Sequence, residues 1–318
     1  MIIMQAVIDY HERTKHLPQR YARSPGSLDW ANEPDPFRRY EGAPLFPLPL
    51  LAKDPDNDYR DLYERSRNRP QPFSFKNIAA FLELSLGLSA WKSYRETSWA
   101  LRMNPSSGNL HPTEAHLILP PHPETDERGG IYHYHAYSHS LEQRAAFGGR
   151  FWSAVREHFK TDGFLVGLSS IYWRESWKYG ERAFRYCQHD LGHALGCLSF
   201  SGNLLGWKVT CLQVPSDEEV STLLGFPQVK WHRFEEEHPG PLLFVHPHSI
   251  PAVPRSIPPE LVEAFRSLSF VGEPKRLSPS HQDWAVIDQA ATATEKPRTP
   301  EVPTRYLKEE FPEKEAPS

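Results

Sequence analysis

The chain has 318 residues, 39% of them hydrophobic and 24% charged, with a formal net charge of −4 and a pI near 6.5. A chain of this size can bury a sizeable core, and its charge balance offers no basic surface for nucleic acid as the main ligand. No uncharged apolar run approaches the roughly 20 residues of a membrane span, so we expect neither a nucleic-acid nor a membrane partner.

The N-terminus and the cysteines favour a cytoplasmic location. The opening sequence MIIMQAVIDYHERTKH has a short apolar patch and then charges, without the apolar core or cleavage site of a signal peptide. Cys187, Cys197 and Cys211 show no C-x-x-C spacing, and any disulfide would leave one of them unpaired. We therefore expect a reducing environment and three buried thiols.

The first half of the chain predicts an extended segment, a helix and two strands. Residues 1–50 are rich in proline, arginine and aromatic residues, which predicts an extended segment that packs on the core. Residues 74–87 combine a serine N-cap, apolar spacing of three and four and a final glycine, and predict a helix. The sequence AHLILP (115–120) predicts a short strand, and the alternating residues 129–144 predict another.

The second half alternates helices and strands. The predicted elements are a helix over 148–159, a strand over 164–172, a long helix from about 180 to 205, a strand over 207–214, a helix over 216–224 and a strand over 241–247. Five strands interleaved with helices predict an α+β fold, with a mixed five-stranded sheet flanked by helices, in a domain over 51–270. Residues 271–318 are rich in Pro, Glu, Lys and Ser and predict a tail or linker.

The stretch RMNPSSGNLHPTE, residues 102–114, predicts a turn that presents its backbone. Its two prolines would break a helix and remove ladder hydrogen bonds from a strand. Gly108 removes side-chain bulk where backbone N–H groups could meet a planar polar ligand. Small donors and acceptors surround it, namely Ser106, Ser107 and Asn109. The stretch is either a ligand-binding turn or a plain polar connection between a helix and a strand.

A second stretch, residues 173–207, places Lys178 and Tyr179 just before the long helix. That helix is rich in small residues such as Gly192 and Gly196, which let another helix approach closely and indicate a buried central helix or a dimer seam. A lysine or tyrosine whose pKa is shifted by its surroundings can act as a base. A lone lysine, however, is more commonly a solvated surface residue.

Together, these stretches resemble the nitroreductase superfamily. The turn is similar to the FMN-binding turn of that superfamily, Pro-Ser-Ser-x-Asn-x-x-Pro. The ordered set YHERTKH, RMNPSSGNLHPTEAHLIL, IYHY with HSLEQR, and SWKYGERAFRY with LGHALG resembles its SagB-type dehydrogenase branch, which includes the azoline oxidases that make thiazole and oxazole rings. The likeness spans roughly residues 8–247. It implies a nitroreductase-like fold and an obligate dimer with FMN at the interface.

The resemblance also implies residue roles by position. Pro105–Asn109 would contact the isoalloxazine ring and ribityl chain of FMN. Lys178 and Tyr179 match the Lys-Tyr pair of the azoline oxidases, which assists proton removal while flavin N5 accepts hydride. Gln213 and Val214 fall where the family offers a backbone N–H to N5, a donor that stabilises the charge of reduced flavin.

The phosphate-binding residues depart from the family pattern. The family usually has Arg-x-Ser-x-Arg or Arg-Ser-x-Arg, whereas this chain has RSRNRP. We expect Arg65, Ser66 and Arg67 to hold the phosphate, because guanidinium groups suit a dianion; the alternative is a plain solvated basic stretch. The cationic ligand that usually follows the last strand is not obvious, since only His246 and His248 stand there.

Other cofactors have weaker support. His189 with His193, and His133 with His135, have spacings that metal ligands use, but no cysteine or glutamate completes a zinc pattern, so we expect no metal. Neither a G-x-G-x-x-G nor a Walker loop occurs. If NAD(P)H reacts, it would do so by stacking transiently on the flavin.

We therefore predict an FMN-dependent oxidoreductase of the SagB type that acts on a small molecule or peptide heterocycle by hydride transfer to flavin N5. An NAD(P)H-dependent nitro or quinone reductase is the second hypothesis, and a non-catalytic flavin-fold subunit of a biosynthetic complex is the third. Because some relatives carry two such domains in tandem, the expected dimer could contain two copies of this chain or this chain and a separate half.

Overall fold

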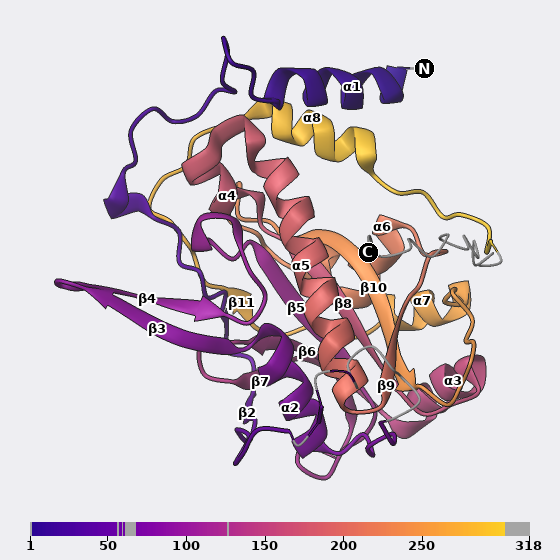
Figure 1. Ribbon diagram of the computed structural model, residues 1–318. Helices are drawn as coiled ribbons and strands as arrows, with labels where there is room; N and C mark the ends of the chain where they lie inside the picture. The colour runs from indigo at the N-terminus through magenta and orange to yellow at the C-terminus, as the bar shows by residue number, and fades with distance from the viewer. Residues whose placement is uncertain (1, 56, 59, 61–67, 126, 303–318) are drawn as a thin grey trace, which may run out of the picture.

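The computed structural model describes residues 2–55, 57–58, 60, 68–125 and 127–302. At the centre of this part of the chain lies a seven-stranded sheet with the order β2-β7-β6-β5-β8-β10-β9, in which all neighbouring strands are antiparallel (Figure 1). The strands are β2 (Leu45–Pro47), β5 (Thr113–Leu119), β6 (Gly129–His135), β7 (Ser140–Phe147), β8 (Phe164–Ser170), β9 (Trp207–Cys211) and β10 (His238–Pro247).

Helices cover both faces of this sheet. On one face pack α2 (Phe75–Leu86) and α5 (Ala183–Leu204), and on the other pack α3 (Gly149–Phe159), α6 (Asp217–Leu224) and α7 (Pro259–Arg266). Leu117 of β5 belongs to the first apolar cluster, and its neighbour Ile118 belongs to the second. Successive residues of the strand therefore enter different cores, as the alternation of a strand requires.

Seven further elements lie outside these layers or in the connections. They are α1 (Ile2–Thr14), α4 (Tyr172–Tyr179), α8 (Ala285–Thr294) and the 3₁₀ turns η1 (Trp30–Asn32), η3 (Ser107–Asn109), η4 (Gly180–Arg182) and η5 (Phe226–Gln228). The helix α4 follows β8 directly and leads through η4 into α5. Its C-terminal end therefore lies where the long central helix begins.

The predicted helices are confirmed with small shifts of their ends. The helix predicted over 74–87 is α2, and the Ser74 hydroxyl accepts the N–H of Asn77 as an N-cap. The helices predicted over 148–159 and 216–224 are α3 and α6, and α6 begins with a capping box between Ser216 and Glu219. The long helix predicted over about 180–205 is η4 followed by α5.

The sheet has seven strands instead of the predicted five, and it is antiparallel instead of mixed. Residues 129–144 form the hairpin of β6 and β7, not one strand. The chain reverses at residues 136–139, where the His139 N–H donates to the carbonyl of Ala136 and His139 has φ 43°. The sequence does not announce this reversal, because it lacks the Asn-Gly or Asp-Gly pair that usually marks a tight hairpin.

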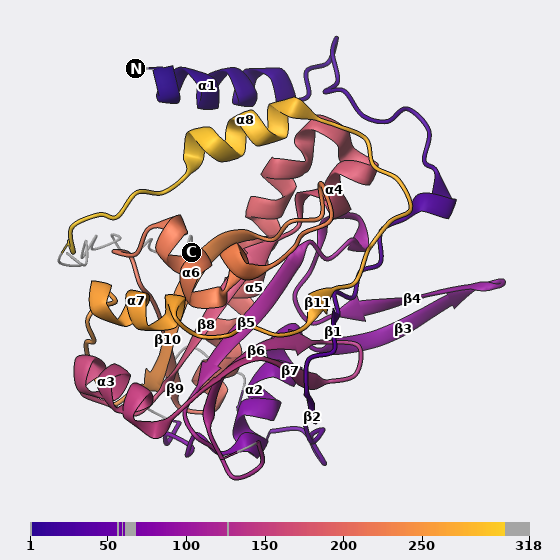
Figure 2. The ribbon, with the colours of Figure 1, turned by 180° about the vertical axis from the view of Figure 1, so that it is seen from behind.

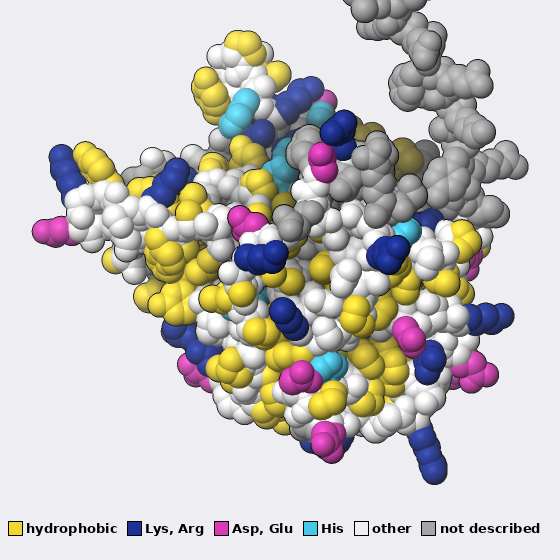
Figure 3. All heavy atoms as spheres, turned by 60° about the horizontal axis from the view of Figure 1, so that its bottom comes forward, with side chains coloured by type: hydrophobic (Ala, Val, Ile, Leu, Met, Phe, Trp, Pro, Cys, Tyr) yellow, Lys and Arg dark blue, Asp and Glu magenta, His cyan; other side chains and the backbone are white. Residues whose placement is uncertain are grey.

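A second unpredicted hairpin, β3 (Leu88–Tyr94) and β4 (Thr97–Arg102), projects from the body of the protein (Figures 1 and 2). It leads directly into the 102–114 stretch. Its aromatic side chains are exposed, with 53% of Trp91, 64% of Tyr94 and 37% of Trp99 accessible. Figure 3 shows hydrophobic side chains gathered along this hairpin, which points to the left in that view.

The two ends of the described chain pack against each other. The helices α1 and α8 lie side by side, and β1 (Tyr40–Glu41) pairs with β11 (Glu273–Pro274). Trp284 and Ile287 are buried. Residues 271–302 are therefore packed on the fold and do not form the predicted tail, because their few apolar side chains fill sites that the central layers leave open; residues 303–318 lie outside the described residues.

The cysteines correct another expectation. All three are free, but only Cys187 is buried, whereas Cys197 is half-buried and Cys211 is exposed. Among the described residues, no group of three or more potential ligands is arranged to hold a metal ion. The helices of the same part of the chain are all too short or too polar to cross a bilayer.

Candidate active site

The stretch between β4 and β5 is a compact turn that Asp190 of α5 holds from inside. The backbone N–H of Ser107 donates to both carboxylate oxygens of Asp190 at 3.1 Å, and Ser107 Oγ lies 3.3 Å from Oδ1. Asp190 is fully buried. Burial raises its pKa, while hydrogen bonds from Ser106 and Ser107 oppose that rise. The turn is thus fixed to the central helix through its own backbone.

Asn109 gives the turn its shape. Three residues here have left-handed backbone, Gly108 and Asn109 with φ 62° and His111 with φ 50°. The Asn109 amide Nδ2 donates to the carbonyl of Ala100 at 2.8 Å, and its Oδ1 lies 2.9 Å from His111 Nε2. The Ser106 hydroxyl accepts the N–H of His111 at 2.8 Å. Both polar ends of Asn109 are therefore used within the turn.

We expect Asn109→Ala to lower the free energy of unfolding by about 1–3 kcal/mol, because it removes two hydrogen bonds and a residue that tolerates positive φ. Ser107→Ala is the matched control, since the backbone N–H that reaches Asp190 remains and only the longer hydroxyl contact is lost. Urea denaturation of both variants measures the difference. Equal losses in the two variants would contradict the role of Asn109.

Lys178 and Tyr179 lie against Gly108. A Cβ atom built on Gly108 would lie 2.5 Å from Tyr179 Oη and 3.1 Å from Lys178 Nζ. The lysine Nζ is 5.6 Å from the centre of the Tyr179 ring. The structure therefore brings together the two stretches that sequence reasoning selected, the turn and the Lys-Tyr pair, at the one residue of the turn that has no side chain.

Two buried acids behind this contact were missed by sequence reasoning. Glu175 of α4 is completely buried, and neither of its carboxylate oxygens has a hydrogen-bond partner among the described residues. Burial and the nearby Asp190 raise the pKa of Glu175 well above its usual range. Because Asp190 accepts several donors and Glu175 accepts none, the surroundings favour a proton on Glu175 over one on Asp190. In the sequence each of the two acids stands among other polar residues, with Arg174 and Lys178 near Glu175 and His189 and His193 near Asp190, so neither gives a local signal of burial.

Tyr179 keeps its proton at neutral pH. Burial, with added repulsion from Glu175, raises the pKa of Tyr179 to about 12. Its hydroxyl can therefore donate a hydrogen bond toward a molecule bound at the turn but cannot serve as the base.

Gln213 and Val214 have different neighbours from the turn. The N–H of Val214 donates to the carbonyl of Arg255 at 3.0 Å, and its carbonyl accepts the N–H of Thr299 at 3.1 Å. Lys296 Nζ donates to the carbonyl of Pro215 at 2.7 Å. Within one chain, this segment is thus joined to the 296–299 region and not to the Lys-Tyr pair.

The predicted phosphate ligands Arg65, Ser66 and Arg67 lie outside the described residues. The residues that follow them pack on the end of α5, where Asn68 Nδ2 donates to the carbonyl of Asn203 at 2.9 Å.

The two histidines near the last strand are engaged within the fold. His246 Nε2 lies 2.9 Å from Thr210 Oγ1, and His248 Nδ1 lies 2.8 Å from the carbonyl of Gly206.

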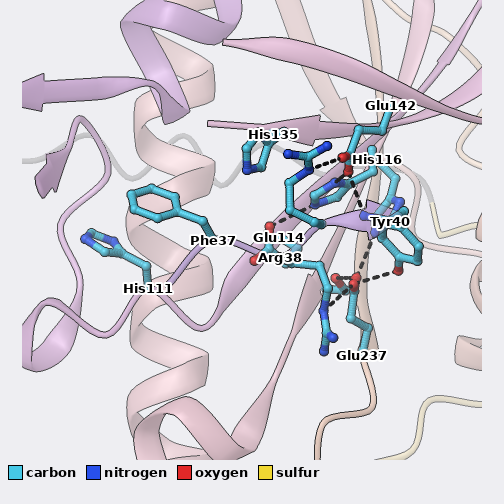
Figure 4. A network of polar contacts seen from close by, with 12 residues as sticks. Phe37, Arg38, Tyr40, His111, Glu114, His116, His135, Glu142 and Glu237 are labelled. Carbon is cyan, nitrogen blue, oxygen red and sulfur yellow. Dashed lines mark hydrogen bonds and ion pairs between the residues drawn. The ribbon is translucent and has the colours of Figure 1, made fainter. Parts of the chain in front are cut away.

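Glu114, the carboxylate that ends the motif, begins a buried network of charges beside the turn (Figure 4). It accepts a hydrogen bond from Arg174, and it lies 3.0 Å from His133 Nε2. His133 Nδ1 lies 2.9 Å from Glu142. Burial alone would lower the pKa of His133, but the hydrogen bonds with Glu114 and Glu142 raise it to about 9. A positively charged imidazole therefore sits between two carboxylates.

The N-terminal segment completes this network on the same face of the sheet. Tyr40 Oη donates to Glu237 at 2.7 Å, and Arg38 Nε lies 3.6 Å from the same carboxylate. Glu237 also lies 2.7 Å from His116 Nε2 and accepts the hydroxyl of Ser169 at 2.6 Å. All these side chains are buried. The network fastens the N-terminal segment to the sheet and so closes the fold behind the turn.

Comparisons with known proteins place this geometry in a known fold. No protein-family model and no curated protein sequence matches the chain. A candidate nitroreductase from Anabaena variabilis is similar in structure, with a TM-score of 0.61 and 22% identity over 92% of this chain and 55% of its own. This likeness confirms the predicted nitroreductase-like α+β fold. The chain spans about half the length of that protein.

Two other solved structures are more distant. A candidate nitroreductase from Ralstonia eutropha has a TM-score of 0.45 and 14% identity, over 72% of this chain and 98% of its own. The Escherichia coli microcin synthetase McbBCD complex with truncated pro-MccB17 bound has a TM-score of 0.42 and 16% identity, over 76% of this chain and 80% of its own.

Proposed function

We propose that the chain is an FMN-dependent oxidoreductase of the SagB type, whose flavin lies against the turn 105–109. The observation that carries the proposal is the contact of Lys178 and Tyr179 with Gly108. A fold similar to that of a nitroreductase supports the reaction class, and the Lys-Tyr pair favours a dehydrogenase that removes a proton over a nitro or quinone reductase, which needs no such base.

The residues of the turn fit a planar aromatic cofactor. Pro105 and Gly108 are exposed, and Gly108 has no side chain at the point where the turn faces Lys178 and Tyr179. The backbone cannot collapse inward, because Asp190 holds the Ser107 N–H. The turn therefore offers an apolar edge, a bare backbone and two adjacent donor groups. Arg65 and Arg67 remain the proposed ligands of the phosphate.

Bound FMN would supply a hydride acceptor at N5. The protein's part is to handle the proton. Lys178 Nζ would take a proton from one substrate atom while the neighbouring carbon gives up its hydride to the bound flavin, so that a double bond forms between the two substrate atoms. Tyr179 Oη, which stays protonated, would orient the substrate by donating a hydrogen bond. A neutral Glu175 behind them would keep the pocket from gaining a second negative charge beside Asp190.

A second chain would complete the site. The turn with the Lys-Tyr pair and the segment Gln213–Val214 have separate surroundings within one chain, so we infer that the turn of one copy faces that segment of another. The helix α5 supports this, because a Cβ atom on Gly192 or Gly196 would meet nothing within 4 Å and the neighbouring His193 is exposed. Sedimentation of the purified chain should give the mass of a dimer.

The identity of the released small molecule tests the proposal. Mass spectrometry of the supernatant after denaturation should show FMN at about one per chain, and the folded protein should have the flavin spectrum that dithionite bleaches. Lys178→Ala should retain that flavin but slow its reduction by an azoline-containing peptide by roughly 10²-fold or more. Lys92→Ala, an exposed lysine of the β3–β4 hairpin, is the control. A colourless protein that does not take up added FMN would overturn the assignment.

A further inference from the structure

A cavity of about 710 Å³ lies between α4, α6, α8 and the residues that lead into β10. It is bounded by the side of α4 that carries Tyr172 and Ser176, whereas Lys178 reaches the turn. In Figure 2 the helices α8 and α6, which form two of its walls, lie one above the other. This volume is typical of a small-molecule pocket. The cavity takes no part in the proposed flavin site, and the inference below does not rest on that site.

The charge of its lining is strongly negative. Six carboxylates line it, Asp217, Glu218, Glu236, Asp283, Asp288 and Glu295. Among the described lining residues Arg233 is the one lysine or arginine, and it lies 3.8 Å from Asp283 with 80% of its side chain exposed. Outside the lining, Arg266 lies 3.9 Å from Glu218. Glu236, Asp288 and Glu295 have no ion pair within the described part of the chain.

Two carboxylates of the lining are penalised by burial. Burial raises the pKa of Asp288, the neighbouring Asp283 raises it further, and Arg233 opposes part of the rise. Burial also raises the pKa of Asp217, whose carboxylate accepts the backbone N–H of Lys296 at 2.8 Å. A positively charged group inside the cavity would remove this penalty, because opposite charges at short range in a low dielectric attract strongly.

Aromatic rings form the rest of the wall. Tyr172 stacks on His238 with a centroid separation of 4.0 Å, and Trp173, Phe234 and Trp284 also line the cavity. Such faces attract cations. The chain already contains one example at the rim, since the Arg233 guanidinium lies 4.5 Å from the centre of the Phe234 ring and close to Asp283.

An unpaired donor in the same wall points to a ligand. Trp284 is only 8% exposed, and its indole Nε1 has no acceptor among the described residues. A buried N–H without a partner is costly, and native proteins rarely leave one. An oxygen of a bound molecule would satisfy it.

From these features we infer that the cavity binds an organic cation, a ligand whose guanidinium or ammonium group faces Glu236 and Asp288 while its apolar part lies on Tyr172 and Trp284. Two sources share this chemistry, a free amine and a basic side chain of a peptide. A carbonyl next to the cationic side chain could accept from the Trp284 N–H. Because neither the turn nor Lys178 lines the cavity, its occupant would be distinct from a molecule that reacts at the turn.

Calorimetric titration of the full chain tests the inference with matched probes. The probes are agmatine, the peptide acetyl-Ala-Arg-Ala-amide and its neutral counterpart with citrulline in place of arginine. We expect saturable binding of at least one arginine-type probe and at least tenfold weaker binding of the citrulline peptide. Binding of agmatine alone indicates a free amine as the ligand, and tighter binding of the arginine peptide indicates a peptide segment.

The double variant Glu236→Gln/Asp288→Asn should weaken binding of the cation at least tenfold. Glu157→Gln, an exposed glutamate on α3, is the control and should leave it unchanged. Thermal unfolding checks the fold, and the double variant should be no less stable because it removes repelling charges. Equal affinity for the arginine and citrulline peptides, or no saturation by either cation up to about 10 mM, would overturn the inference.

Discussion

Replacing Glu114 with glutamine is expected to lower the free energy of unfolding by about 3–5 kcal/mol, the cost of removing one partner from a buried ion pair. Glutamine keeps the size of the side chain but removes its charge. Arg174 and His133 would then remain buried with too little negative charge to balance them. The Nη2 atom of Arg174 already lacks a hydrogen-bond partner within the described chain, so it has no substitute acceptor ready.

An exposed ion pair supplies the matched control. Arg156 and Asp162 lie 2.9 Å apart, but 64% and 65% of their side chains are exposed. Asp162→Asn should therefore change the free energy of unfolding by less than about 1 kcal/mol. Urea denaturation of the two variants and the parent chain measures both values. If Glu114→Gln lowered the free energy of unfolding no more than Asp162→Asn does, the Glu114 network would not stabilise the fold as a buried ion pair does.

The pH dependence of the free energy of unfolding provides a second test of the same network. The pKa of His133 is about 9 in the folded chain and about 6.5 when unfolded. Its stabilisation is thus complete below about pH 6.5 and is lost as the pH rises through 9, because the folded state then holds a proton that the unfolded state has released. Stability of the parent chain should fall over this interval.

The Glu114→Gln variant should make the free energy of unfolding depend less steeply on pH between 6.5 and 9. Without the Glu114 carboxylate, His133 loses one of the two charged hydrogen-bond partners that raise its pKa. On the acid side, burial would raise the pKa of Glu114, but Arg174 and His133 hold it at about 2. This contribution is complete above about pH 4.5 and is lost as the pH falls toward 2. A parent profile that stays level between pH 6.5 and 9 would contradict the assigned charge on His133.

This network also shows where sequence reasoning ends. Helices such as α2 and α6 could be predicted because their caps and apolar spacing are local signals, and Ser74 and Ser216 do cap them. The pairing of His133 with Glu114 and Glu142 could not be predicted. Its Glu114 contact depends on the register of β5 against β6, and its Glu142 contact depends on a hairpin reversal at His139 that no turn residue marks. Distant contacts of this kind leave no local pattern.

The turn of the candidate site could be singled out from the sequence, and for a physical reason. A turn that must present bare backbone requires a residue without a side chain, and Gly108 provides it within a recognisable motif. The Lys-Tyr pair was singled out by its resemblance to the azoline oxidases, because a lone lysine before a helix is ordinarily a surface residue. Glu175 and Asp190 were not, because a carboxylate within a helix is ordinarily a surface residue, and only the packing of α4 on α5 buries them. The terminal residues 271–302 were misassigned for the same reason, since their composition alone does not reveal what they cover.

The second large effect is expected from Gly108→Ala. The new methyl group would be placed 2.5 Å from Tyr179 Oη, on a residue whose φ of 62° already disfavours a side chain. We expect a loss of about 2–4 kcal/mol of stability, from positive φ and from overpacking together. We also expect bound flavin to fall at least several-fold, because the Lys-Tyr pair must move away from the turn. Flavin content per chain and urea denaturation measure the two effects separately.

Two companion variants separate the steric contact with Tyr179 from the cost of placing a side chain on left-handed backbone. Gly26 has φ 81° with nothing within 4 Å of a built Cβ, so Gly26→Ala should show only the backbone part of the loss, about 1–2 kcal/mol. Adding Tyr179→Phe to Gly108→Ala removes the hydroxyl that lies closest and should restore part of the stability. The double variant can recover stability even if the parent chain binds no flavin. That result would support the contact between Tyr179 and Gly108 but would contradict FMN as the cofactor. If Gly108→Ala behaves like Gly26→Ala, Tyr179 does not rest on the turn, and the proposed site has lost the contact that defines it.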